Sequence, residues 1–217
     1  EFPVPHLLPF GDLVTYGYES PILLMAELTV PGSLGGGEEI VLAGKARWVV
    51  CDDNVCVPER ADISLTMTVG DEGKNDATAE LFADARDALP VAVDWPAQFA
   101  VQDGKVSFEI AADDRPTSLE DAYLYIESRK LVKYGSQAAG FTRAGMSFVM
   151  DAARNADSEE AVGAVLTFTD AAGEHQAVAL DITKSSGPIA AATGSSVIAS
   201  DGGVSFWEAA FYAFLGG

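Results

Sequence analysis

The stretch Arg47-Trp48-Val49-Val50-Cys51-Asp52-Asp53-Asn54-Val55-Cys56-Val57-Pro58-Glu59 holds both cysteines of the chain and is followed by Ile63-Ser64-Leu65-Thr66-Met67-Thr68-Val69. In the second run apolar residues occupy every other position, which is typical of a strand with one buried face. The residues between the cysteines have the composition of a turn. The sequence therefore predicts two strands with a turn between them that carries the cysteines.

The same alternation recurs along the chain, separated by turns rich in Gly, Asp and Asn. Many short alternating strands are typical of β-sandwiches. We expect an all-β fold of two immunoglobulin-like β-sandwich domains in tandem, with a short helix between them and a C-terminal helical tail. The further predicted strands are Pro21–Met25, Glu39–Leu42 and, later in the chain, residues 105–111, 121–127, 145–151, 162–169 and 175–182.

A helix is predicted between the two domains. Asp76 can cap its start and Pro90 ends it. The apolar residues that fall on one side of it are Leu81, Phe82, Ala85 and Leu89. This gives a first sandwich over residues 1–89 that carries the cysteines, a second sandwich without cysteine over 90–188, and a tail over 189–217.

The tail begins with Ile189–Ser200, whose small and polar residues predict a linker. The aromatic and apolar run Val204–Gly217 follows and is shorter than the roughly 20 residues that span a bilayer. It is either an amphipathic helix docked on the second domain or the start of a transmembrane helix, whose clustered aromatic residues would suit the membrane interface.

Charge and histidine content narrow the classes of partner. The formal net charge of -20 over 217 residues argues against nucleic acid or an anionic membrane as a direct partner. His6 and His175 are the only histidines, and neither is close in sequence to the cysteines, which disfavours a metal site. We expect no metal and no cofactor.

The cysteine pair has two readings. A disulfide that closes so short a loop gives roughly 2 kcal/mol in the chain-entropy model, so it would be a weak structural staple. The same spacing suits thiol exchange, because one cysteine can attack a partner disulfide while the other resolves the mixed disulfide. The carboxylates of Asp52 and Asp53 disfavour the thiolate form, which predicts a dithiol that donates electrons rather than a strong oxidant.

Four features together resemble the periplasmic N-terminal region of the DsbD/ScsB family of thiol:disulfide interchange proteins, and its ScsB-like branch in particular. They are the cysteine motif with its Trp and Pro, Thr15-Tyr16-Gly17-Tyr18-Glu19-Ser20, Pro3-Val4-Pro5-His6 and the tail Ala213-Phe214-Leu215-Gly216-Gly217. The tail resembles the opening of that family's first transmembrane helix.

The resemblance implies a protein-disulfide reductase module in the periplasm, as part of an inner-membrane protein. Electrons would come from transmembrane and thioredoxin-like domains of the same protein. They would pass to thioredoxin-fold partners such as a disulfide isomerase or, in the ScsB branch, proteins tied to copper tolerance. Cys56 would form the mixed disulfide and Cys51 would resolve it.

The resemblance also implies a cap loop that shields the cysteines until a partner displaces it. The segment matching that loop runs from Asp12 through Thr15, Tyr16 and Gly17 to Tyr18. DsbD proper has Phe where this chain has Thr15, so Tyr16 or Tyr18 would supply the shielding ring. From the residues alone, Tyr16 suits core packing as well as capping.

Trp48, Asp52, Asp53 and Pro58 make up the expected surroundings of the thiols. Trp48 is expected in the core, and Pro58 is expected to end strand pairing after Cys56, because proline lacks an N–H donor. The alternative function from another class is a non-catalytic exported binding module of two β-sandwiches, with Cys51 and Cys56 in a structural disulfide.

Overall fold

The computed structural model describes residues 2–10, 13–52, 55–70, 76–112, 116, 118–189 and 196–197. The chain forms two compact units, and each is considered by itself. Unit 1 comprises Glu1–Pro3 and Ile22–Ala88, and unit 2 comprises Val4–Pro21 and Leu89–Gly217. The chain passes between units close to the expected boundary at residue 89, but Val4–Pro21 belongs to unit 2 rather than to the unit that carries the cysteines.

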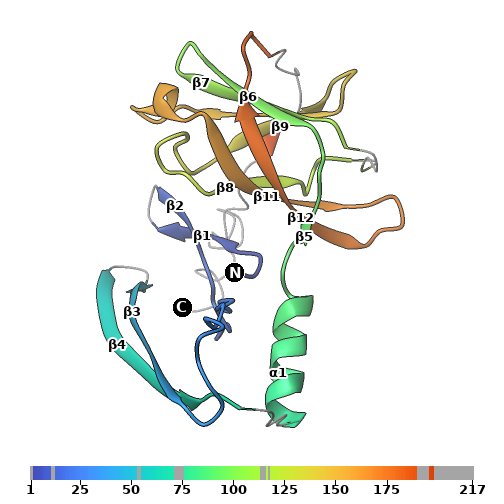
Figure 1. Cartoon of the computed structure of the whole chain (residues 1–217). Helices are drawn as coiled ribbons and strands as arrows, with labels where there is room; N and C mark the ends of the chain where they lie inside the picture. Colours follow the sequence, from blue (N-terminus) through green and yellow to red (C-terminus); the bar gives the residue numbers. More distant parts are fainter. Residues whose placement is uncertain are drawn as a thin grey trace, which may run out of the picture. The chain divides into compact units, whose positions relative to one another are not determined.

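Unit 1 is built on a long antiparallel ribbon. Strands β3 (Glu39–Cys51) and β4 (Cys56–Thr68) have 13 residues each and pair along their whole length (Figure 1). The separately predicted strands at Glu39–Leu42 and Trp48 are thus one strand. Helix α1 (Asp76–Asp87) confirms the helix predicted between the two strand-rich regions.

The described part of unit 1 contains one two-stranded sheet, and the second sheet that a sandwich needs is not among these residues. Residues 21–25, predicted as a strand, belong to no strand. In the described part of this unit Met25 is the one buried hydrophobic side chain. An alternating pattern specifies which face of a strand is apolar, but it does not supply the layer that covers that face.

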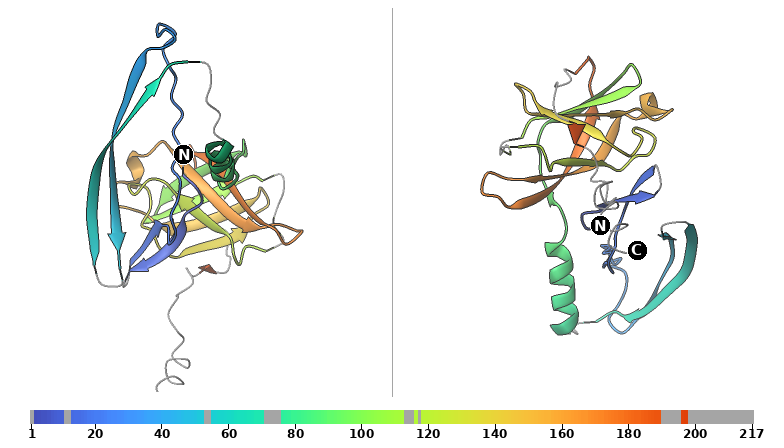
Figure 2. Two further views of the ribbon diagram at one scale, coloured as in Figure 1. Left: turned by 90° about the horizontal axis from the view of Figure 1, so that it is seen from below. Right: turned by 180° about the vertical axis from the view of Figure 1, so that it is seen from behind.

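Unit 2 contains one nine-stranded sheet around a single hydrophobic core (Figure 2). Phe99, Phe108 and Phe148 lie on three neighbouring strands and are fully buried in it. The main path of the sheet runs β13-β9-β10-β7-β6-β12-β11-β8, and β5 pairs with β12. The strands are β5 (Val91–Ala92), β6 (Ala97–Gln102), β7 (Lys105–Ile110), β8 (Tyr123–Ile126), β9 (Gln137–Phe141), β10 (Met146–Asp151), β11 (Ala161–Thr169), β12 (His175–Lys184) and β13 (Ser196–Val197).

The five strands predicted for this region correspond to β7, β8, β10, β11 and β12. The short strands β5 and β13, together with β6 and β9, were not predicted. Strand β13 lies within the predicted linker and pairs with β9. The predicted tail from Val204 lies outside the described residues.

The sheet of unit 2 curls into an arrangement between a sandwich and a barrel, and Gln137 links its two ends. This side chain lies on β9, is only 2% exposed, and faces Leu124 on β8. The Leu124 N–H donates to Gln137 Oε1 at 3.0 Å, and Gln137 Nε2 donates to the Leu124 carbonyl at 3.4 Å. One amide thereby satisfies both backbone groups of a buried edge residue, as a neighbouring strand would.

A short hairpin, β1 (His6–Phe10) and β2 (Leu13–Gly17), completes unit 2. Tyr16 of β2 stacks on Tyr134 with ring centroids 4.1 Å apart, and meets Tyr125 edge-on at 5.0 Å. Aromatic pairs in such geometries contribute about 0.5–1.5 kcal/mol beyond the area they bury. These rings therefore hold the hairpin against the rest of unit 2.

Candidate functional site: a disulfide at the end of a β-ribbon

Cys51 and Cys56 form the last pair of the β3–β4 ladder and are joined by a disulfide, with their Cα atoms 4.0 Å apart. Beyond them the Asp52 N–H donates to the Val55 carbonyl at 2.9 Å. The Val55 N–H donates to Asp52 Oδ1 at 2.8 Å. Asp52 thus acts as a turn residue whose side chain satisfies a backbone donor.

These turn bonds fix the phase of the ladder. In an antiparallel ladder hydrogen-bonded and non-hydrogen-bonded pairs alternate, so the Asp52–Val55 bond makes Cys51–Cys56 a non-hydrogen-bonded pair. The Val69 N–H bond to the Glu38 carbonyl at the other end gives the same phase. Such pairs bring side chains closest together, which is the geometry that a cross-strand disulfide needs.

The phase also explains why the ladder continues past Pro58. Pro58 pairs with Val49, two residues from the cysteines, and this pair is again non-hydrogen-bonded. Its ring nitrogen therefore faces the outer edge of β4, where no ladder bond is lost. The prediction that Pro58 ends pairing is wrong; the proline instead removes a donor from an exposed edge, which discourages unwanted strand addition.

The disulfide end of the ribbon is open to solvent. Both cysteines are exposed, and so are the side chains on either side of them. Trp48, predicted in the core, is 41% exposed. An attacking thiolate from another molecule can therefore reach the sulfurs without any rearrangement of the ribbon within unit 1.

The two faces of the ribbon differ in character, because successive side chains of a strand point to opposite faces. The disulfide shares its face with Val49, Pro58 and pairs further along the ladder whose members, apart from Ala43 and Val41, are polar or charged. The opposite face is almost wholly apolar. It carries Ile40, Leu42, Ala46, Trp48, Val50, Val57, Ala61, Ile63, Leu65 and Met67, with Gly44 and Glu59.

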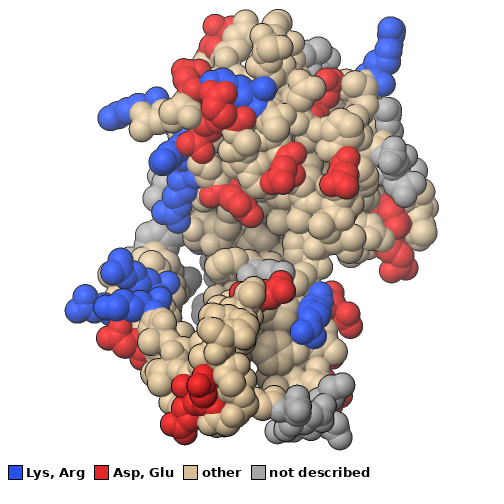
Figure 3. All heavy atoms as spheres, in the orientation of Figure 1, with Lys and Arg blue, Asp and Glu red and all other residues tan. Residues whose placement is uncertain are grey.

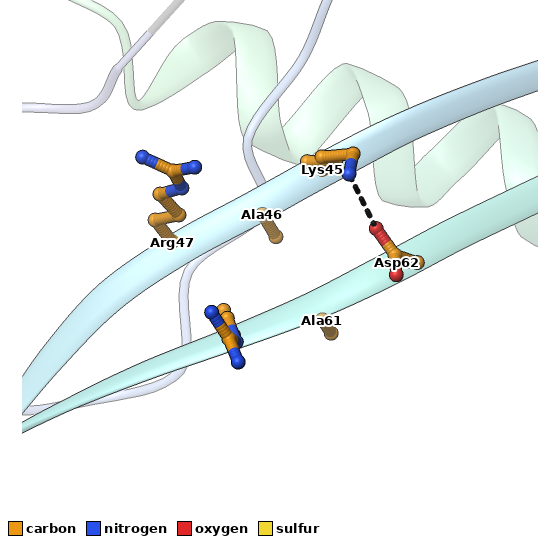
Figure 4. Close-up of a pocket in the computed structure, with 6 residues that line it drawn as sticks. Lys45, Ala46, Arg47, Ala61 and Asp62 are labelled. Carbon is orange, nitrogen blue, oxygen red and sulfur yellow. Dashed lines mark ion pairs between the residues drawn. The ribbon is translucent and has the colours of Figure 1, made fainter.

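Two hollows open beside the ribbon, and Arg47 and Arg60 line both of them. One of about 290 Å³ is completed by Lys45, Ala46, Ala61 and Asp62. In it Lys45 Nζ lies 3.6 Å from Asp62 Oδ1, across the ribbon (Figure 4). The other, of about 580 Å³, is completed by Trp48, Val49, Pro58 and Glu59. The two arginines were not predicted as site residues, although each lies four residues from a cysteine in the sequence.

The predicted cap-loop residues lie in unit 2. Thr15, Tyr16 and Gly17 belong to β2, and Tyr18 follows it. Burial raises the pKa of Tyr16 well above its ordinary value, as expected for a ring enclosed by other tyrosines. Tyr16 is half-buried and packs against three tyrosine rings of unit 2, outside the hydrophobic core, and its shielding of the cysteines stays a prediction. Asp12 and Asp53 lie outside the described residues.

Across the described ranges no group of three or more His, Cys, Asp or Glu side chains is placed to hold a metal ion. No helix in those ranges is long and apolar enough to cross a membrane. Comparison with family models, with curated proteins and with solved structures found no match for this chain.

Proposed function

We propose that the chain is a thiol:disulfide interchange module in which the Cys51–Cys56 disulfide is reversibly reduced and reoxidised. The observation that carries the proposal is the exposed disulfide on the last pair of a β-ribbon. Nothing in unit 1 covers it among the described residues, so a protein thiolate has direct access to the sulfurs.

The disulfide is poorly placed to serve as a staple. Thirteen residue pairs already hold β3 and β4 in register, so Cys51 and Cys56 stay adjacent whether or not the sulfurs are bonded. Closing so short a loop removes little chain entropy, worth about 2 kcal/mol. What the ribbon does provide is two thiols held side by side, which favours rapid resolution of a mixed disulfide.

The exchange proceeds in two steps. The Cys56 thiolate attacks one sulfur of a partner disulfide, forming a mixed disulfide and releasing the partner's other sulfur as a thiolate. The Cys51 thiolate then attacks Cys56 Sγ, which forms the Cys51–Cys56 disulfide and releases the second partner thiolate. Two electrons pass to the partner, whose thiolates take up protons from water, and a dithiol donor reduces the module again by the reverse route.

The wider setting follows from the resemblance to the DsbD/ScsB family. In this proposal unit 1 is part of an immunoglobulin-like domain in the periplasm of an inner-membrane protein. Transmembrane and thioredoxin-like domains of the same protein supply the electrons, and thioredoxin-fold proteins receive them. The segment around Tyr16 and Tyr18 is the cap that a partner displaces.

The second candidate is a non-catalytic exported binding module with a structural disulfide. The apolar face of the ribbon favours it, since large exposed apolar patches mark interaction sites. The two candidates differ in redox behaviour. A structural disulfide has a potential below about -300 mV, whereas a relay disulfide equilibrates with thioredoxin-fold partners at roughly -270 to -180 mV.

The test is a redox titration of the Cys51–Cys56 pair against glutathione and a thioredoxin-fold protein, followed by trapping. A Cys51→Ala variant, which cannot resolve, should accumulate a mixed disulfide on Cys56. The matched Cys56→Ala variant should trap much less. A pair that remains oxidised throughout the relay range, with neither variant trapping a partner, would refute the proposal and favour the binding module.

A further inference from the structure

Arg47 and Arg60 form a basic pair on the same face as the disulfide. They are directly opposite one another in the ladder, and the Val49–Pro58 pair separates them from the cysteines on that face. Four residues of extended strand place them about 13 Å from the disulfide along the ribbon. A protein that docks on this face to exchange disulfides therefore covers both arginines.

This arrangement is unfavourable for the isolated ribbon. Like charges directly opposite each other destabilise a strand pair, and they are closest in a non-hydrogen-bonded pair such as this one. Among the described residues neither arginine has an ion pair, whereas the adjacent Lys45 is paired with Asp62 (Figure 4). Within the described part of the chain, both guanidinium groups are therefore available to bind a carboxylate of another molecule.

The arginine pair stands out against the net charge of the chain. The protein has 13 Lys and Arg against 33 Asp and Glu, and some of the basic side chains lie together over the β3–β4 ribbon, as others do over unit 2 (Figure 3). Arg47 and Arg60 line both hollows beside the ribbon. A strongly negative protein repels acidic partners in general, so a local positive site determines where such a partner can approach.

We propose that Arg47 and Arg60 dock carboxylates of the redox partner and so select thiol proteins whose reactive cysteines are bordered by acidic residues. This inference rests on the proposed function. A guanidinium accepts a carboxylate through two parallel hydrogen bonds, which adds orientation to the attraction. The site is exposed, so its main effect is on the rate of encounter and on its dependence on salt.

The experiment measures how fast the disulfide of the intact chain is reduced by two synthetic dithiol peptides. One carries glutamates about four residues from its cysteine pair, and the other carries glutamines at the same positions. Dithiothreitol, which is neutral and small, reports the intrinsic reactivity of the disulfide. The variants are Arg47→Gln with Arg60→Gln and, as a control of the same chemical change, Lys45→Gln, whose lysine is already paired.

We expect the Arg47→Gln, Arg60→Gln protein to be reduced about tenfold more slowly by the acidic peptide at low ionic strength. Its rates with the neutral peptide and with dithiothreitol should be unchanged, and 0.5 M salt should abolish the difference. Lys45→Gln should have a much smaller effect. The arginine substitutions relieve a repulsion, so they should not impair folding.

The failures are distinguishable. If dithiothreitol and both peptides leave the disulfide oxidised, the proposed function itself is refuted. If the disulfide exchanges but the arginine variant loses no rate with the acidic peptide, only the docking site is refuted. Binding of the intact chain to anionic phosphatidylserine vesicles, lost in the arginine variant, would also overturn it by assigning the pair to a membrane surface.

Discussion

Replacing Gln137 with leucine tests how the curled sheet of unit 2 closes. Leucine is close to glutamine in volume, so the change removes hydrogen bonds without creating a large cavity. It leaves the buried N–H and carbonyl of Leu124 without their partners at 3.0 and 3.4 Å. An orphaned buried backbone group costs about 1–3 kcal/mol, and the longer bond contributes less.

We therefore expect Gln137→Leu to lower the free energy of unfolding by about 2–3 kcal/mol. For a chain of this size that corresponds to a fall of about 5–10 °C in Tm. The matched control is Gln102→Leu, the same chemical change at an exposed position at the end of β6, which should stay within about 0.5 kcal/mol.

Thermal unfolding gives the global effect, and hydrogen exchange of the Leu124 amide gives the local one. Exchange at Leu124 should accelerate in Gln137→Leu and remain slow in Gln102→Leu. Equal stability of the two variants, with a protected Leu124 amide in both, would refute the idea that the amide links the ends of the sheet.

Three other perturbations have expected outcomes. In Gly145→Ala the new Cβ would clash with the carbonyl oxygen of Ile110 on β7, so we expect a loss of about 1–3 kcal/mol in denaturant unfolding. Gly187→Ala, with open space around it, should be near neutral. Burial raises the pKa of Tyr125 to about 12, so the unfolded chain releases this proton first. The contribution of Tyr125 to stability is therefore fully present below pH 10 and falls between pH 10 and 12, and Tyr125→Phe should flatten that fall in a pH series of unfolding midpoints. Changing Cys51 and Cys56 together to serine should cost at most about 2 kcal/mol and leave the exchange protection of β11 and β12 unchanged; loss of the whole fold would mean that the disulfide is structural.

Sequence patterns located five strands of unit 2 but not their order. The strands with clear alternation, such as β7 and β11, were predicted close to their observed bounds. Strand β9, Gln137–Phe141, was missed because its Gln-Ala-Ala-Gly-Phe sequence has little alternation. The closure through Gln137 was also hidden, since nothing local to a glutamine marks it as the partner of a strand edge 13 residues away.

At the candidate site, too, local features were predicted from the sequence and contacts between distant residues were not. The cysteine pair and its turn were visible in the sequence because spacing and turn composition are local properties. The position of Tyr16 was not, since a hairpin near the start of the chain packs on tyrosines more than 100 residues later. Trp48 was expected to be buried because aromatic residues in alternating strands usually have a covering layer, and the described part of unit 1 supplies none.

The even number of residues between the cysteines sets the register of the ribbon, and the register determines which side chains share a face with the disulfide. Four intervening residues allow a closing pair, Asp52 and Val55, and place Cys51 directly opposite Cys56. Because side chains alternate, the same phase puts Arg47 and Arg60 on the disulfide face. A shift of one residue in pairing would move one strand's cysteine and arginine to the apolar face. The turn length thus couples the redox pair to the basic pair, so an insertion in the turn should impair both disulfide formation and selection of acidic partners.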